Sequence, residues 1–405
     1  NMHELASGAT TVSSVAGQTL NPYDPSRTPG GSSGGTATAV AASFGAVGWG
    51  TDTCGSIRTP AAHTALFALR PTLGRTPTSG VVPLARSHDV VAPIARTVPD
   101  LAVALQATLD PWQGASGAEG FSFVGALTWS SLDGLRVGVL DEYFVESGED
   151  VASQWIMERA LDRMLRAEEG VTTLDLSGML GADPIPSDRS EEGEPARLTR
   201  AGIGLMAALG AETVSVTVPE LEALVGGSSL IEWEFRTDFN AYLASSPRAP
   251  VRSLAELLAD DLLHESLRER VRAREFMDGV DPTGYEAASG RRAELRAALD
   301  SLFDDAGLDV LVYPSVRRVP APIGEMQLGS TCGLSSGSGW PAINVPLGIS
   351  EDGLPVGMEV LGRVPGGRGP RARACVRGPR RAVEHAPAAG GRHAGSPGRR
   401  GAAHR

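Results

Sequence analysis

The sequence contains no lysine, because all 36 basic residues of the 405-residue chain are arginine. Aromatic residues make up only 5% of the chain, and no apolar run approaches the roughly 18 residues that a membrane-spanning helix needs. A net charge of -12 argues against a surface for nucleic acid. We therefore expect neither a nucleic-acid partner nor a membrane association, and the 41% hydrophobic content is ordinary for a soluble globular protein.

Cysteine is also scarce. The three cysteines, Cys54, Cys332 and Cys375, show no metal-ligand spacing, and we predict neither a metal site nor a disulfide framework from them. Cys54 lies inside a serine-containing loop, so a thiol nucleophile has to be weighed there against a structural role. We favour the structural role.

What the chain does contain is two glycine-rich serine loops near its N-terminus. The first reads GGSSGGT at 30–36, and the second reads GTDTCGSIRTP at 50–60. Glycine permits positive φ angles and close approach of a ligand, and consecutive unpaired N–H groups can hold an anion or a developing oxyanion. One such loop alone is typical of a tight turn or a phosphate-binding nest. The small residues at 36–42 predict a helix that packs closely behind both loops.

These paired loops resemble those of the amidase signature family, the serine hydrolases that cleave carboxamides with a Ser–cis-Ser–Lys triad. The resemblance covers most of the chain. Its weaker matches are NMHEL at 1–5, NPYDP at 21–25, LFALRPT at 66–72, WPAINVP at 340–346 and DGLPVG at 352–357. The resemblance implies an α/β fold with a mixed central sheet flanked by helices on both faces.

The resemblance also implies the roles of individual residues. Ser56 matches the nucleophile, and Ser32 matches the cis-serine that relays a proton between the nucleophile and the base. The oxyanion hole of the family corresponds to the backbone N–H groups of Thr53, Cys54, Gly55 and Ser56. Three further residues support the loops: Ser33, Asp52 and Arg58. The family's chemistry implies no cofactor and no metal.

The general base of the family is a lysine that lies upstream of the segment matching residues 1–4. Arginine cannot replace it, because arginine does not lose its proton in proteins. No histidine is placed convincingly as a base, and a Ser56–His63 dyad has no support in the sequence. We expect that the true start of the chain precedes Asn1 and that this chain has little or no amidase activity.

The order of patterns along the chain also favours an α/β architecture. Strands are predicted first at 81–84 and 135–140, and helices at 97–109 and 151–166. An exposed loop or insertion is predicted at 179–199. The later predictions are strands at 212–218, 308–314 and 340–346, mostly helical structure over 228–306 and a Ser/Gly-rich loop at 330–338.

Two parts of the chain differ in composition. Residues 1–362 form the predicted amidase signature domain, which lacks its N-terminal part. Residues 363–405 form an Arg/Gly/Pro-rich tail with no Leu, Ile, Met, Phe, Trp or Tyr, which cannot bury enough apolar surface to offset its ordering entropy. We expect this tail to be disordered or the product of a frameshift.

Three functions remain open at this point. The first is hydrolysis of a small-molecule carboxamide through an acyl-enzyme. For this function we expect a cytoplasmic protein, and we leave open both a homodimer and a signal peptide upstream of Asn1. The second is the amidase component of a tRNA-dependent amidotransferase, which works with partner proteins. The third, from another class, is a non-catalytic remnant or binding protein, which the missing lysine favours. The sequence does not name the amide.

Overall fold

The computed structural model describes residues 1–109, 122–128, 131–144, 193–260, 262–277 and 282–364. Its centre is an eight-stranded sheet with the strand order β3-β5-β4-β9-β10-β8-β6-β7. Strand β6 runs parallel to β7 and β8, while the other neighbours are antiparallel, so the sheet is mixed. The strands of this sheet are β3 (Val47–Asp52), β4 (Phe67–Arg70), β5 (Val90–Ala95), β6 (Arg136–Leu140), β7 (Glu212–Val216), β8 (Val310–Pro314), β9 (Ala342–Ile349) and β10 (Pro355–Gly362).

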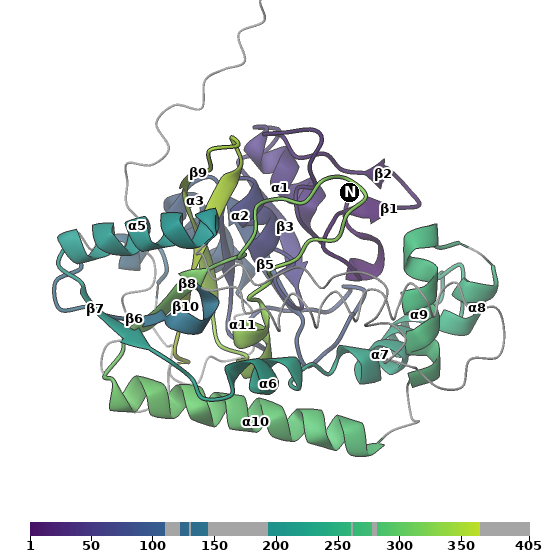
Figure 1. Cartoon of the computed structure of the whole chain (residues 1–405). Coiled ribbons are helices and arrows are strands. Elements are labelled where there is room, and N and C mark those ends of the chain that lie inside the picture. The colour runs from purple at the N-terminus through teal and green to yellow at the C-terminus, as the bar shows by residue number, and fades with distance from the viewer. Residues whose placement is uncertain (110–121, 129–130, 145–192, 261, 278–281, 365–405) are drawn as a thin grey trace, which may run out of the picture.

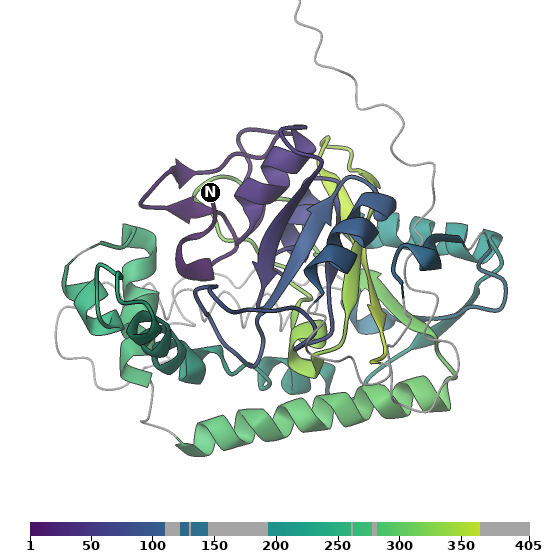
Figure 2. The ribbon, with the colours of Figure 1, turned by 180° about the vertical axis from the view of Figure 1, so that it is seen from behind.

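Helices lie on both faces of the sheet, with α1, α2 and α5 on one face and α3 on the other (Figures 1 and 2). The long helix α10 runs along the bottom of both views and packs on α6 and α11. The α-helices of the described residues are α1 (Gly34–Ala41), α2 (Arg58–His63), α3 (Val98–Thr108), α5 (Glu194–Ala208), α6 (Leu221–Gly226), α7 (Ile231–Ser245), α8 (Leu254–Ala259), α9 (Glu265–Met277), α10 (Pro282–Asp305) and α11 (Gly333–Ser338).

Short elements complete the described chain. A separate two-stranded sheet pairs β1 (Val12–Ser13) with β2 (Gly17–Gln18) beside the first serine loop. Three short 3₁₀ helices are η1 (Glu4–Ala6), η2 (Gly125–Thr128) and η3 (Asp141–Tyr143). Among the described residues, no helix combines the length and the apolar character needed to cross a membrane.

The main core combines residues of the middle strands with residues of α3, α5, α6 and α10. All residues of β8 and β10 are buried, including Glu359 of β10, and β8 reads as a continuous rather than alternating apolar run. Leu295, Leu299 and Phe303 follow one face of α10 at a spacing of four residues and are buried against this core. Phe303 meets Trp340 edge to face, with ring centroids 5.1 Å apart. Burial of each such side chain contributes about 1.5–3 kcal/mol.

Most of the predicted elements are confirmed. The α/β class and the mixed sheet with helices on both faces are observed. The helix predicted at 97–109 is α3, and its N-cap Thr97 accepts the Asp100 N–H at 3.2 Å. The strands predicted at 135–140, 212–218, 308–314 and 340–346 are β6, β7, β8 and β9, and the small residues at 36–42 fall largely in α1.

Three predictions are wrong in part or wholly. Residues 81–84 form no strand, because Val81 N–H closes a turn onto Thr78 and Leu84 N–H donates to the Asp89 side chain. Residues 333–338 of the predicted third loop form α11, in which the buried Ser338 Oγ donates to the Leu334 carbonyl at 2.6 Å.

The third difference concerns the loop predicted at 179–199, which overlaps α5 from Glu194 onward. Its earlier part lies outside the described residues. The helix predicted at 151–166 and nearly all of the tail at 363–405 lie outside them too.

Candidate active site

The first serine loop precedes α1 and contains a cis peptide bond between Gly31 and Ser32. The side chain of Thr11 holds this loop: its Oγ1 donates to the Gly30 carbonyl at 2.6 Å and accepts the Gly34 N–H at 3.1 Å. Ser32 is fully buried, and its Oγ has no hydrogen-bond partner in the described part of the chain. A buried hydroxyl without a partner carries a desolvation penalty, and such groups concentrate where a functional partner is expected.

Ser33 joins the first loop to the second. Its N–H donates to the carbonyl oxygen of Ser56 at 3.0 Å, and its Oγ lies 3.3 Å from both the N and the O of Thr51 in β3. The approach requires glycine at position 50, because a Cβ there would lie 2.7 Å from the Ser33 Cβ and 2.9 Å from Ile57 Cγ2. The two loops that the sequence singled out therefore meet in space.

The second loop connects β3 to α2 and carries the predicted nucleophile, Ser56, which is 6% exposed. Gly55 has φ +80°, a conformation that side chains rarely adopt. The Gly55 N–H, which the resemblance assigns to the oxyanion hole, donates to Asp52 Oδ1 at 2.8 Å instead. No acceptor among the described residues pairs with the N–H groups of Thr53, Cys54 or Ser56. Three N–H groups of this turn are thus available to an anion.

Asp52 is the centre of a buried ionic network beneath this turn. Its carboxylate accepts Arg58 Nε at 3.0 Å and Arg70 Nη1 at 3.1 Å, and all three side chains are at most 1% exposed. Burial alone would raise the pKa of Asp52, but the Arg58 and Arg70 guanidiniums lower it well below its ordinary value. Burial lowers the pKa of Arg70 to about 10, against the opposing effect of Asp52. Asp52 therefore stays ionised and fixes both the turn and the start of α2.

The network continues into the sheet through Glu359 of β10. Glu359 Oε1 accepts Arg58 Nη1 at 2.5 Å and the Tyr313 hydroxyl of β8 at 2.7 Å. Burial raises the pKa of Glu359, and the Arg58 guanidinium opposes that shift. Two guanidiniums and two carboxylates balance in charge, which makes their burial tolerable as a unit.

Asp89 braces the other side of the turn. Its Oδ1 accepts the Thr53 hydroxyl at 2.5 Å, and its Oδ2 accepts the N–H groups of Leu84 and Ala85 at 2.8 and 3.0 Å. Burial raises the pKa of Asp89, while the Thr53 hydroxyl lowers it. Thr53 is thereby fixed between the end of β3 and the loop that precedes β5.

A disulfide joins Cys54 of the second loop to Cys332, the residue before α11, with the two Cα atoms 5.1 Å apart. The prediction that no disulfide would form is wrong. The two cysteines are 278 residues apart, so only the pairing of distant strands brings them together, and the spacing of cysteines carries no such information. Since both sulfur atoms are bonded, Cys54 offers no thiol nucleophile in this state.

The histidines do not form a dyad with Ser56 in the described structure. His63 ends α2 and packs under the first loop, where a Cβ on Gly30 would lie 3.1 Å from its Nδ1. Burial lowers the pKa of His63 to about 4 and that of His88 to about 2. His88 Nε2 accepts the Leu230 N–H at 3.0 Å and lies 2.6 Å from Arg292 Nη1, so it is part of the helical packing.

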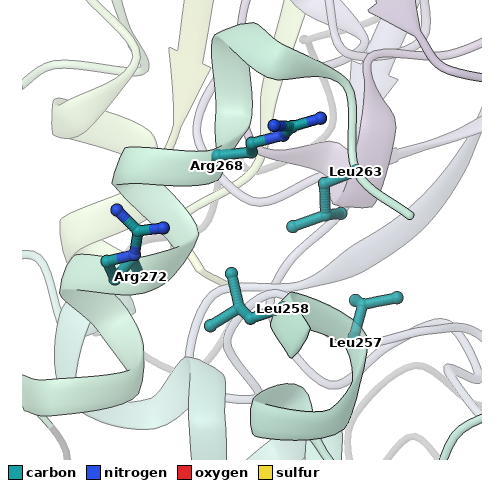
Figure 3. Close-up of a pocket in the computed structure, with 5 residues that line it drawn as sticks. All are labelled: Leu257, Leu258, Leu263, Arg268 and Arg272. Carbon is teal, nitrogen blue, oxygen red and sulfur yellow. The ribbon is translucent and has the colours of Figure 1, made fainter. Parts of the chain in front are cut away.

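Three large aromatic side chains lie in the core rather than at the serine loops. Phe235 and Phe239 stack on each other in the core of the α7–α9 region, and Trp340 lies in the main core. A separate hollow of about 50 Å³ lies between α8 and α9. Figure 3 shows Leu258 and Leu263 extending into it, with two arginines of α9 beside it. None of its lining residues belongs to the serine loops.

In the part of the chain that is described, no group of three or more metal-ligating side chains is present. The two serine loops converge where Ser33 N–H donates to the Ser56 carbonyl, and Asp52 and Arg58 support the turn that carries Ser56. Several supporting residues were not predicted from the sequence, namely Thr11, Arg70, Asp89, Tyr313, Cys332 and Glu359. Each lies far from the loops in sequence or in an unremarkable strand, so no local pattern marks it.

A family model described as Amidase matches residues 1–180 and 189–365. A glutamyl-tRNA(Gln) amidotransferase subunit from Chloroflexus aurantiacus is 33% identical over 383 residues, which are 90% of this chain and 69% of that protein. The corresponding protein of Rubrobacter xylanophilus is 32% identical over 375 residues, covering 89% and 70%.

Among solved structures, the native peptide amidase from Stenotrophomonas maltophilia is similar, with a TM-score of 0.68 and 27% identity over 90% of this chain and 69% of that one. The paired serine loops indicated the same family as the family model, the sequence relatives and the solved structure. The chain belongs to the amidase family of amide-hydrolysing enzymes.

Proposed function

We propose that this chain cleaves a carboxamide C–N bond by acyl transfer to Ser56. The observation that carries the proposal is the hydrogen bond from Ser33 N–H to the Ser56 carbonyl, which fixes the two serine loops against each other. The buried Ser32 hydroxyl without a partner supports a relay beside the nucleophile. The unpaired N–H groups of Thr53 and Cys54 support an oxyanion hole.

In the proposed reaction, Ser56 Oγ attacks the amide carbonyl carbon, while Ser32 takes up the Ser56 proton and passes its own hydroxyl proton to the departing nitrogen. The carbonyl oxygen becomes an oxyanion that accepts the unpaired N–H groups. The C–N bond then breaks, the nitrogen leaves with a proton as ammonia or an amine, and an ester on Ser56 remains. Water attacks that ester and releases the carboxylic acid and the serine.

An amide nitrogen leaves only when it is protonated, so amide cleavage requires the proton that Ser32 passes on. An activated ester does not share this requirement, because a phenolate leaves without a proton. We therefore expect Ser56 to react with activated esters much faster than with amides.

The substrate proposal has two forms. The relatives at 32–33% identity are named as amidotransferase subunits, which favours a chain that releases ammonia from a primary amide and works with partner proteins rather than as the homodimer left open above. The likeness to the peptide amidase structure favours an independent amidase instead. Co-purification of partner proteins and stimulation by charged tRNA support the first form, and their absence supports the second.

The test measures product release from two substrate classes by the chain and by Ser56→Ala. We expect p-nitrophenolate release from p-nitrophenyl acetate to fall about 10³-fold in Ser56→Ala. We expect ammonia release from L-glutamine, L-asparagine or an amidated peptide to be slower than p-nitrophenolate release and to be lost in Ser56→Ala. The proposal is overturned if neither substrate class shows any Ser56-dependent release.

A further inference from the structure

The Cys54–Cys332 disulfide lies at the second serine loop, close in sequence to the proposed nucleophile. Cys54 supplies one of the unpaired N–H groups of the second loop and is two residues from Ser56. Its bonding partner, Cys332, precedes α11, a segment that the chain reaches 278 residues later. The bond therefore links the oxyanion-forming turn covalently to a segment that is distant from it in sequence.

Different segments of the chain hold the individual residues of the second loop. Asp52 holds the Gly55 N–H, and Asp89 holds the Thr53 hydroxyl. The side chain of Cys54 is held by a different segment: its sulfur is bonded to Cys332 and accepts the Ser336 hydroxyl at 3.2 Å. Both restraints on Cys54 thus come from the α11 segment.

The packing around the bond leaves little space. A Cβ on Gly55 would lie 2.9 Å from the Cys332 Cβ and 2.9 Å from Thr59 Oγ1. When a disulfide is reduced, its two sulfur atoms separate to van der Waals contact, because nothing bonds them. In a closely packed site this separation has to move the loop, the α11 segment or both.

The bond is also within reach of solvent. Cys54 and Cys332 are both partly exposed, although Thr53, Gly55 and Ser56 beside them are buried. Exposed disulfides are the ones that thiols attack readily, and in reducing compartments such bonds serve mainly catalytic or sensing roles. The structure thus combines accessibility with a position at the reactive turn.

We propose that the Cys54–Cys332 disulfide is a redox-operated lock that holds the oxyanion-forming turn in its anion-accepting geometry. The proposal concerns regulation of the site and rests on the function proposed above. A dithiol opens the lock: one thiolate attacks a sulfur of the bond to give a mixed disulfide, and the second thiol displaces it. The protein gains two electrons and two protons as two thiols, and the dithiol leaves as its cyclic disulfide.

The first measurement determines which cysteines of the full chain carry free thiols. Alkylation with iodoacetamide under denaturing conditions, followed by peptide mapping, is expected to leave Cys54 and Cys332 unlabelled before dithiothreitol treatment and labelled after it. Labelling of both residues in chain that was purified under air and never reduced overturns the proposal, because no bond would then exist to act as a lock.

The second measurement follows backbone amide hydrogen exchange in the oxidised and reduced chain. We expect reduction to speed exchange at 53–57 and 331–336 by about tenfold or more, while the amides of α3 keep their rates. Unchanged rates in both loop segments overturn the proposal. An equal rise in α3 also overturns it, because the bond would then stabilise the whole fold rather than lock one turn.

Variants separate the bond from side effects of the reductant. Cys332→Ser is expected to show the fast loop exchange without dithiothreitol and no further change with it. The matched control Cys375→Ser removes the third cysteine and is expected to behave as the parent chain does. Equal loop exchange in Cys332→Ser and the oxidised parent chain overturns the proposal.

These readouts do not require catalysis, so failure of Ser56 to react would leave their outcome unaffected. Where p-nitrophenolate release is observed, reduction is expected to slow it about tenfold in the parent chain and not in Cys332→Ser. A parent chain that reacts equally fast before and after complete reduction overturns the lock, whatever its exchange rates.

Discussion

The N–H of Ser33 donates to the carbonyl oxygen of Ser56 at 3.0 Å, so the residue that follows Ser32 is joined directly to the proposed nucleophile. Ser33 also contacts Thr51 of β3 through its hydroxyl. The position of Ser56 is therefore set by the first loop and by the sheet together. Changes in the supports of either loop are expected to alter the site.

The buried carboxylate of Asp52 is the first such support. Asp52→Asn removes the charge that balances Arg58 and Arg70, and leaving guanidiniums without their carboxylate in a buried network costs about 3–5 kcal/mol. We expect the free energy of unfolding in urea to fall by about that amount. Asp352→Asn, in the exposed turn between β9 and β10, is the matched control and should change it by less than about 0.5 kcal/mol. Equal effects of the two substitutions would contradict the network.

Gly55 offers a second test, because its φ of +80° and its close packing can be separated experimentally. Gly55→Ala adds a Cβ that lies 2.9 Å from Cys332 Cβ and from Thr59 Oγ1. Gly353→Ala has nearly the same φ, +81°, with nothing within 4 Å of the added carbon. We expect Gly353→Ala to lower the free energy of unfolding by about 1 kcal/mol and Gly55→Ala by about 1–3 kcal/mol more. Thermal or urea unfolding of the two variants measures the difference, and equal losses would argue against tight packing at the turn.

His63 predicts how stability depends on pH. Burial lowers its pKa to about 4 from an ordinary 6.5. Between these values the unfolded chain binds a proton at this position and the folded chain does not. The stabilising effect of the neutral side chain is thus fully present above pH 6.5 and is lost as the pH falls toward 4.

The measurement compares the slope of unfolding free energy against pH for the parent chain and His63→Gln. Between about pH 4.5 and 6 the variant's slope should be smaller by one proton, which is about 1.4 kcal/mol per pH unit. Above about pH 7.5 the two slopes should coincide, which serves as the internal control. Parallel curves for the parent chain and the variant in the acid range would mean that His63 has the same pKa in the folded and the unfolded chain.

The sequence allowed the two loops, the fold class and most elements to be predicted because each rests on local chemistry. Thr97 and Asp100 mark the start of α3, and unbroken apolar residues mark β8. The helix α11 was missed because serine and glycine are typical of loops, whereas here buried hydroxyls such as that of Ser338 bond to the helix's own carbonyls.

The supports of the site could not be predicted, for a different reason. Glu359 reaches Arg58 across 301 positions and Cys332 reaches Cys54 across 278, so each pairing exists only once the sheet has formed. Asp89 precedes β5 and offers no pattern that connects it with Thr53. Local motifs therefore located the reactive loops, while the groups that fix their geometry came from the tertiary fold.

The most direct test of the account is to locate the acyl group after brief exposure of the chain to p-nitrophenyl acetate. The reaction is quenched in acid and the peptides are mapped by mass spectrometry, with Ser56→Ala and Ser32→Ala treated in parallel. The account predicts one acetyl group, on Ser56, absent in Ser56→Ala and formed more slowly in Ser32→Ala. Acetylation of another residue at the same rate in the parent chain and in Ser56→Ala would contradict the assignment of Ser56 as the nucleophile.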